Sequence, residues 1–234
     1  MKTPDSRFYC PLICAGRITL DENESNHAIR VCRAAVGDTL QLSDGLGHYA
    51  DATITNADAK ACEVEVKEVE TVSNERPKVS LGIACLKDDA LEEVVFHAAQ
   101  TEIDKITFLR TDFSQEPKAS DLHKTVRRAE LKSLVSLKQS KKPWLTQIEG
   151  PVTLDEWLET YQGDIVLCDI DGAPNTEKIE NTTTLLVGPE GGFSPRELAL
   201  IRAHRGKVHL LNLGKTRLRA RTAAIIALGK VVCV

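Results

Sequence analysis

The 234-residue sequence has no CxxC pair, although it contains seven cysteines. The cysteines are scattered and odd in number, so their spacing indicates neither a metal site nor a disulfide framework. Several lie in apolar runs, as Cys85 and Cys168 do, where a free cysteine behaves as a small hydrophobic residue. We therefore expect reduced thiols in the core and no bound metal.

The sequence also lacks long apolar runs and a large excess of basic charge. No run reaches the roughly 18 residues that a membrane span needs, and the opening MKTPDSRFYC has no apolar signal-peptide core. Thirty basic against 34 acidic residues give a net charge of −4, which excludes a globally basic nucleic-acid binder. A local basic patch remains compatible with this sum, because binding depends on how charge is distributed. We expect a cytoplasmic protein with no membrane partner.

The pattern of apolar and polar residues changes near residue 75. Before that point, alternating apolar and polar residues and tight-turn dipeptides predict a small β-rich domain around one helix. The expected strands are Thr39–Leu42, His48–Ile54 and Ala61–Val69, and the expected helix is Glu24–Cys32. The polar stretch 73–77 ends in proline, so we place a linker there.

From Val79 onward, apolar runs alternate with amphipathic stretches, which predicts an α/β domain with a mainly parallel sheet. The expected strands are Val79–Leu86, Lys105–Arg110, Trp144–Ile148, Asp164–Cys168, Thr183–Val187 and Lys207–Leu211. The expected helices are Asp89–Thr101, Asp121–Gln139, Thr153–Tyr161, Ser194–His204 and Ala220–Val231. Capping boxes begin two helices, at Thr153 and Ser194, and Gly206 is the expected left-handed stop of the second.

One segment joins an apolar strand to a capped helix through the turn Gly-Pro-Glu-Gly-Gly, residues 188–192. Ligands bind outside the carboxyl ends of strands in open α/β sheets, and glycines there let the backbone approach a ligand closely. The turn is neither a GxGxxG fingerprint nor a Walker loop. A tight strand–helix connection without a ligand explains the same residues equally well.

A second strand end leads into a loop rich in cations before the last helix. Four cations lie within seven residues: Lys215, Arg217, Arg219 and Arg221. Such a density at the carboxyl end of a strand suits contact with phosphate or nucleic acid. A solvated basic face is the alternative interpretation.

Together the two segments resemble the RsmE family of SPOUT methyltransferases. The family pattern GPEGGFSxxE matches 188–194 with Glu197, and LGxxxLRxxTA matches Leu213, Gly214, Leu218, Arg219, Thr222 and Ala223. In the first half, Arg7–Tyr9 resembles the family's opening and His27–Arg33 its HxxxVLR helix. The resemblance spans essentially the whole chain.

The sequence departs from the family pattern at three places. The stretch 96–102 replaces KATELG and includes His97–Thr101; Asp112-Phe113-Ser114 replaces ERS; and Arg221 stands where a glutamate usually precedes Thr-Ala. The cofactor loops are intact, whereas polar positions that could serve substrate or catalysis have changed. We therefore expect these departures to affect the methylation rate and the RNA target more than the use of the cofactor.

The resemblance implies an amino-terminal PUA-like β-barrel, residues 1–72, and a SPOUT α/β domain, residues 78–234, with a carboxyl-terminal trefoil knot. It implies S-adenosylmethionine as cofactor, N3 of a uridine in 16S ribosomal RNA or the small ribosomal subunit as target, and a homodimer. The implied cofactor residues are Leu186, Val187, Gly188, Glu190, Gly191, Gly192, Leu211, Asn212, Leu213, Gly214, Leu218, Thr222 and Ala223. The loop Cys168–Ala173 lines a further wall in this interpretation, or is an acidic surface turn.

Arginine suits the expected chemistry, because uridine N3 carries a proton and the developing anion needs a base or a stabilising charge. Arg219 is the predicted catalytic or substrate-anchoring residue. The predicted RNA contacts are Arg7, His27, Arg30, Arg33, Arg217 and Arg221. Two alternatives stay open: His27 packs or caps its helix, and Arg219 and Arg221 form salt bridges across a dimer.

Two other functions fit the same sequence. One is a noncatalytic RNA-binding or ribosome-assembly protein that has lost turnover through the departures. The other is a SPOUT methyltransferase that acts on another RNA position. The intact cofactor loops disfavour the first, since a pure binder does not need them.

Overall fold

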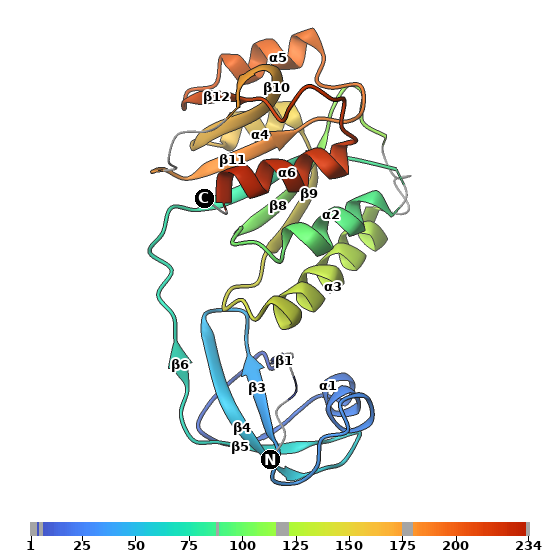
Figure 1. Ribbon diagram of the computed structural model, residues 1–234, viewed down its shortest axis with the longest axis vertical. Coiled ribbons are helices and arrows are strands. Elements are labelled where there is room, and N and C mark those ends of the chain that lie inside the picture. The colour runs from blue at the N-terminus through green and yellow to red at the C-terminus, as the bar shows by residue number, and fades with distance from the viewer. Residues whose placement is uncertain (1–3, 5–6, 88, 116–121, 175–179, 233–234) are drawn as a thin grey trace. The chain divides into compact units, whose positions relative to one another are not determined.

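The computed structural model describes residues 4, 7–87, 89–115, 122–174 and 180–232. The chain divides into two compact units (Figure 1). Unit 1 comprises Met1–Glu75 and Leu134–Leu145, and unit 2 comprises Arg76–Ser133 and Thr146–Val234. The predicted helix start at Asp121 and the cysteine Cys233 lie outside the described residues.

Unit 1 contains a six-stranded sheet in the order β1-β3-β4-β5-β2, with β6 paired to β4. Its strands are β1 Arg7–Tyr9, β2 Gly16–Thr19, β3 Thr39–Ser43, β4 His48–Asn56, β5 Glu63–Val66 and β6 Glu70–Thr71. Apolar residues at alternate positions face one core, as Leu40 and Leu42 do on β3 and Val64 and Val66 on β5. Among the described residues, the end strands β1 and β2 do not pair with each other, so the sheet is not closed.

The expected helix at 24–32 forms, but it starts earlier and changes type. It begins as α1, Glu22–Asn26, because the Asp21 carboxylate accepts the Glu24 N–H at 2.8 Å. It then continues as one π-helical turn, η1, His27–Val31. Ala28 is fully buried, as its apolar spacing predicted.

Unit 1 also includes a segment that is remote in the sequence. The Trp144 ring lies over Gly47, where an added Cβ would come within 2.4 Å of it, and the Leu145 N–H donates to the Gly45 carbonyl at 2.8 Å. The Lys138 ammonium and the Glu24 carboxylate are 2.6 Å apart. The predicted strand Trp144–Ile148 is therefore wrong in its first half, because residues 144–145 pair with the turn after β3.

Unit 2 is an α/β structure with a six-stranded parallel sheet in the order β12-β10-β11-β7-β8-β9. Its strands are β7 Val79–Ala84, β8 Lys105–Arg110, β9 Gln147–Thr153, β10 Asp164–Ala173, β11 Thr183–Val187 and β12 Val208–Leu211. Its helices are α2 Ala90–Ala98, α4 Leu154–Thr160, α5 Pro195–Arg202 and α6 Ala220–Val232, with the first part of α3, Leu122–Ser140. The expected α/β fold is confirmed.

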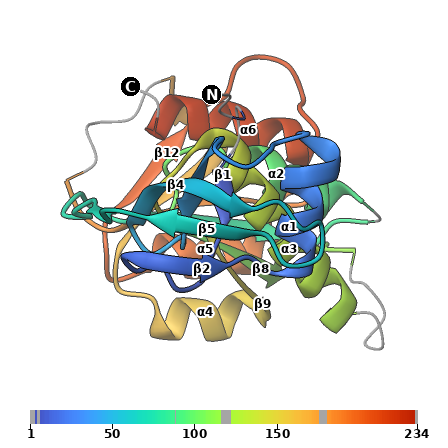
Figure 2. The same ribbon diagram turned by 90° about the horizontal axis from the view of Figure 1, so that it is seen from below.

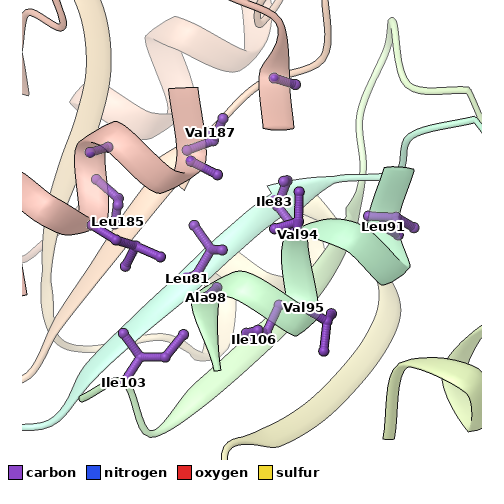
Figure 3. Close-up of a cluster of buried hydrophobic side chains, with 14 of the residues drawn as sticks. Leu81, Ile83, Leu91, Val94, Val95, Ala98, Ile103, Ile106, Leu185 and Val187 are labelled. Atoms are coloured by element: carbon purple, nitrogen blue, oxygen red, sulfur yellow. The ribbon is translucent and has the colours of Figure 1, made fainter. Parts of the chain in front are cut away.

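Alternate residues of the strands face two different cores, one on each side of the sheet. On β11, Leu185 and Val187 belong to a core with α2 and α6, whereas Leu186 belongs to a core with α4 and α5. Figure 2 shows α4 and α6 on opposite sides of this unit. Figure 3 shows the first core, where side chains of β7 and β11 meet those of α2, including Val94 and Val95. Because both faces are covered, the strands read as continuous apolar runs.

Both predicted capping boxes are present, at Thr153 and at Ser194. The predicted left-handed stop at Gly206 is wrong, because α5 ends at Arg202 and Gly206 has no positive φ. A Cβ at Gly206 would lie 2.3 Å from the Gly163 carbonyl oxygen, so close packing of two backbones explains this glycine.

None of the helices in the described ranges is long and apolar enough to cross a membrane. None of the six described cysteines forms a disulfide, and Cys10, Cys62 and Cys85 are buried.

Candidate functional site

A cavity of about 510 Å³ lies at the carboxyl ends of β11 and β12, beside residues 168–170 of β10. This is the edge of the sheet where an α/β fold binds ligands. Nine of the predicted cofactor residues line it: Val187, Gly188, Gly192, Leu211, Asn212, Leu213, Gly214, Leu218 and Ala223. The fold thus brings the Gly-Pro-Glu-Gly-Gly turn and the loop after β12 to one cavity, although helix α5 and strand β12 separate them in the sequence.

Two predicted cofactor residues face elsewhere. Leu186 is fully buried in the opposite core, because its side chain alternates with those of Leu185 and Val187. Thr222 lines a second cavity, of about 320 Å³, formed by residues of α2 and α6.

Glu190 and Gly191 are on the glycine-rich turn but do not line the cavity. The Glu190 carbonyl accepts a hydrogen bond from Arg217 Nη2 at 2.8 Å, and this bond ties the turn to the loop after β12. A Cβ on Gly191 would lie 3.2 Å from the Cβ of Phe113, so this glycine lies against the loop after β8.

The third wall of the cavity is a strand and not the predicted loop 168–173. Strand β10 continues to Ala173, whose carbonyl accepts the Asn212 N–H at 2.7 Å. The Asn212 side-chain amide donates to the Ile170 carbonyl. Of this stretch, Cys168, Asp169 and Ile170 line the cavity.

Cys168 presents a neutral thiol to the cavity. Burial raises the pKa of this thiol to about 12. At neutral pH the sulfur is therefore protonated, and it adds an apolar surface to the wall rather than a nucleophile.

The turn itself is held by a buried carboxylate. Gly192 has a φ of 74°, and its N–H donates to the Pro189 carbonyl at 2.8 Å. Glu197, which is 0% exposed, accepts the Ser194 N–H at 2.8 Å and closes the capping box of α5. The second oxygen of the same carboxylate accepts the Asp112 N–H at 2.8 Å.

The loop after β8 completes this network, which sequence reasoning missed. The Asp112 carboxylate accepts the Ser194 hydroxyl at 2.5 Å and pairs with Arg196 at 3.0 Å. These hydrogen bonds from Arg196 and Ser194 lower the pKa of Asp112. Arg196 also pairs with Asp155 at 2.8 Å. The only sequence signal for this loop was the departure from the ERS pattern at 112–114.

The four cations of the basic loop lie in different surroundings. Arg217 and Lys215 line the cavity, whereas the exposed Arg219 does not. Arg221 lines the second cavity and pairs with Glu93 of α2 at 2.7 Å. Arg219 and Arg221 are two residues apart in the sequence, but the fold places them in different surroundings.

In unit 1, two of the predicted RNA contacts are engaged within the unit. The Arg7 guanidinium lies 4.7 Å above the Tyr49 ring, and burial lowers its pKa. The His27 ring packs against the Phe8 ring with centroids 5.3 Å apart, which is the packing alternative for this residue. Arg30 and Arg33 are exposed.

The cavity has further lining residues that were not predicted to bind the cofactor, among them Phe193 and Leu198 of the opposite core and Ala220 of α6. No group of three metal-ligating side chains occurs within the described ranges.

The sequence matches two family models. The model of the RNA methyltransferase domain covers residues 73–232, and that of the RNA methyltransferase PUA domain covers residues 20–67. The chain therefore belongs to the RNA methyltransferase family. The family expected from the two motifs is confirmed.

The chain is similar to named ribosomal RNA methyltransferases. Ribosomal RNA small subunit methyltransferase E of Rickettsia conorii is 28% identical over 228 residues, which cover 92% of this chain and 89% of the relative. The protein of that name from Mycobacterium bovis is 29% identical over 227 residues, covering 91% and 84%.

Solved structures share the fold. A methyltransferase from Legionella pneumophila in complex with its cofactor SAM has a TM-score of 0.82 at 25% identity, covering 95% of each chain. Ribosomal RNA small subunit methyltransferase E from Neisseria gonorrhoeae, bound to S-adenosyl methionine, has a TM-score of 0.83 at 20% identity, covering 96% of each.

Proposed function

We propose that this protein transfers the methyl group of S-adenosylmethionine to N3 of a uridine in 16S ribosomal RNA. The observation that carries the proposal is the cavity at the ends of β11 and β12 and beside β10, in a chain of the RNA methyltransferase family. Relatives over most of the chain are named for ribosomal RNA of the small subunit, and the Legionella structure holds SAM.

The cavity suits a ligand of that kind. Its volume of about 510 Å³ lies in the range of small-molecule sites. Gly192 and Gly214 both have positive φ, and the space where a Cβ would lie is open at each, so backbone groups are accessible to a ligand. Leucine side chains of β12 and the following loop supply apolar surface for a nucleoside.

The bound cofactor supplies an activated methyl group, so the residues of this chain have to position the two reactants. The neutral Cys168 thiol offers no competing nucleophile in the cavity wall. Arg217, fixed on the Glu190 carbonyl, places a positive charge at the cavity.

We assign Arg219 to the RNA side of the reaction. Arg219 is exposed and is flanked in the sequence by Leu218 and Ala220, which both line the cavity. From this rim a guanidinium can hold the oxygens of the uracil ring as negative charge develops on its imide. Arg217, Arg221 and the exposed Arg30 and Arg33 are assigned to phosphate contacts.

Several broader features belong to the same proposal. Residues 1–72 form a PUA-like β-barrel that acts as an RNA arm, and residues 78–234 form a SPOUT domain with a trefoil knot at its carboxyl end. The protein acts as a homodimer in the cytoplasm, where small ribosomal subunits are assembled. The family match and the parallel α/β sheet support this organisation.

The proposal is tested by calorimetry with S-adenosylmethionine, followed by methyl transfer to small ribosomal subunits that lack the modification. Saturable cofactor binding and one methyl group per subunit are expected. Cofactor binding without transfer would favour a noncatalytic assembly protein, and transfer to a base other than uridine would favour another RNA position.

A further inference from the structure

The loop after β8, residues 111–115, is fixed at several points. The Ser114 hydroxyl accepts the Thr111 N–H at 3.0 Å and donates to the Thr111 carbonyl at 2.9 Å. The Gln115 N–H donates to the carbonyl of Cys85, just beyond β7, at 3.1 Å. Together with the bond from Asp112 N–H to the buried Glu197, these contacts hold both ends of the loop.

The residue at the tip of this fixed loop is an exposed aromatic. Phe113 is 51% exposed, whereas Phe8 and Phe108 are fully buried and Phe193 is 9% exposed. Leaving a phenyl ring in water gives up the free energy that its burial would provide. A ring that is exposed on a loop held this firmly is suited to contact a ligand.

Phe113 lies beside the cavity. Its Cβ is 3.2 Å from the position that a Cβ on Gly191 would take. On either side of Gly191 in the turn, Pro189 and Gly192 line the cavity. The ring therefore packs against the same turn that forms one cavity wall.

The charges behind the ring are compatible with a polyanion. Asp112 and Asp155 would repel RNA phosphates, but Arg196 pairs with both, at 3.0 and 2.8 Å. The loop thus presents the uncharged face of Phe113, and the carboxylates of Asp112 and Asp155 are both paired with Arg196.

We propose that Phe113 is a stacking platform for a base of the RNA substrate, and that it positions the target nucleotide beside the cavity; this rests on the proposed function. Every base has a π-face that stacks on an aromatic side chain, and sequence-specific RNA recognition uses unstacked bases in this way. An enzyme that modifies a base must also hold it outside the helical stack. A protein partner would need a larger apolar patch than one ring.

The proposal is tested with Phe113→Ala, Phe113→Trp and, as a control, Leu131→Ala, which truncates a similarly exposed residue (47%) on α3. The probe is the small ribosomal subunit from a strain that lacks the gene. Phe113→Ala should weaken binding about tenfold, since stacking contributes on that order, and Phe113→Trp and Leu131→Ala should stay within about twofold of wild type.

Two further readouts separate stacking from a structural or electrostatic role. Because the ring releases no counterions, the slope of log Kd against log salt should be unchanged in Phe113→Ala. The thermal midpoint and the cofactor affinity should also be unchanged. Wild-type affinity of the alanine variant, or a tryptophan variant as weak as the alanine variant, would overturn the proposal. If wild type binds subunits through Phe113 but transfers no methyl group, the proposed function fails and the stacking role stands.

Discussion

At the scale of single residues, the two adjacent glycines of the turn, Gly191 and Gly192, lie in different surroundings. Gly192 has a φ of 74° and open space on the cavity side, whereas Gly191 lies against Phe113. The motif alone assigns both to the cofactor, because it carries no information on which side of the turn each residue faces.

We predict that Gly192→Val lowers the affinity for S-adenosylmethionine at least tenfold. A β-branched residue is strained at positive φ and would project toward the ligand. Calorimetry measures this effect. Gly191→Val should instead displace Phe113 and weaken RNA binding, and Gly229→Ala in α6, where an added Cβ meets open space, serves as control. If the Gly192→Val variant bound the cofactor as tightly as wild type, the turn would not be part of the binding site.

At the scale of elements, the sequence predicted the regular parts of unit 2 because their periodicity is local. Strands 105–110 and 183–187 have the predicted bounds, and both capping boxes form. The exceptions depend on distant partners. Trp144 pairs with the turn after β3 rather than extending β9, and β10 continues to Ala173 because Asn212 binds its end.

The loop–turn network also depends on distant residues. Glu197 and Asp112 are 85 residues apart, and no local pattern connects them. The cavity was therefore predictable in position, from the strand ends and glycines, but its connection to the loop after β8 was not.

We predict that the two capping boxes differ in stability effect when their glutamates are replaced by glutamine. Glu197→Gln leaves the N–H of Ser194 or of Asp112 without a carboxylate acceptor at a fully buried side chain, which costs about 1–3 kcal/mol. Glu156→Gln, in the exposed box of α4, should lower the free energy of unfolding by less than Glu197→Gln does. Chemical denaturation of both variants measures the free energy of unfolding. Equal losses would show that the second bond of Glu197, to Asp112, contributes nothing.

At the scale of the whole molecule, each compact unit contains most of one family match, the RNA methyltransferase PUA domain at residues 20–67 and the RNA methyltransferase domain at residues 73–232. Residues 134–145 belong to unit 1 although they follow 76–133, so the boundary is not a single cut in the sequence. The pattern of residues along the sequence can locate a linker. It cannot detect that a later segment, such as 134–145, packs with the first unit.

We predict that the protein is a dimer at micromolar concentration, because two-fold assemblies are the commonest oligomers and the proposed function includes one. Sedimentation equilibrium distinguishes the dimer from a chain of 25.7 kDa. A protein that is monomeric at this concentration and still methylates small ribosomal subunits would contradict the prediction, because activity would then not require a dimer.

The measurement that tests the proposed activity most directly is mass mapping of methylated nucleotides in 16S ribosomal RNA from a strain lacking the gene. We predict that one N3-methyluridine is absent, that the wild-type gene restores it, and that Arg219→Ala restores less than about one hundredth of the rate, corresponding to ~3 kcal/mol of transition-state stabilisation. Arg221→Ala, whose side chain pairs with Glu93, should restore the modification more fully. An unchanged set of methylated uridines in the deletion strain would contradict the proposed function.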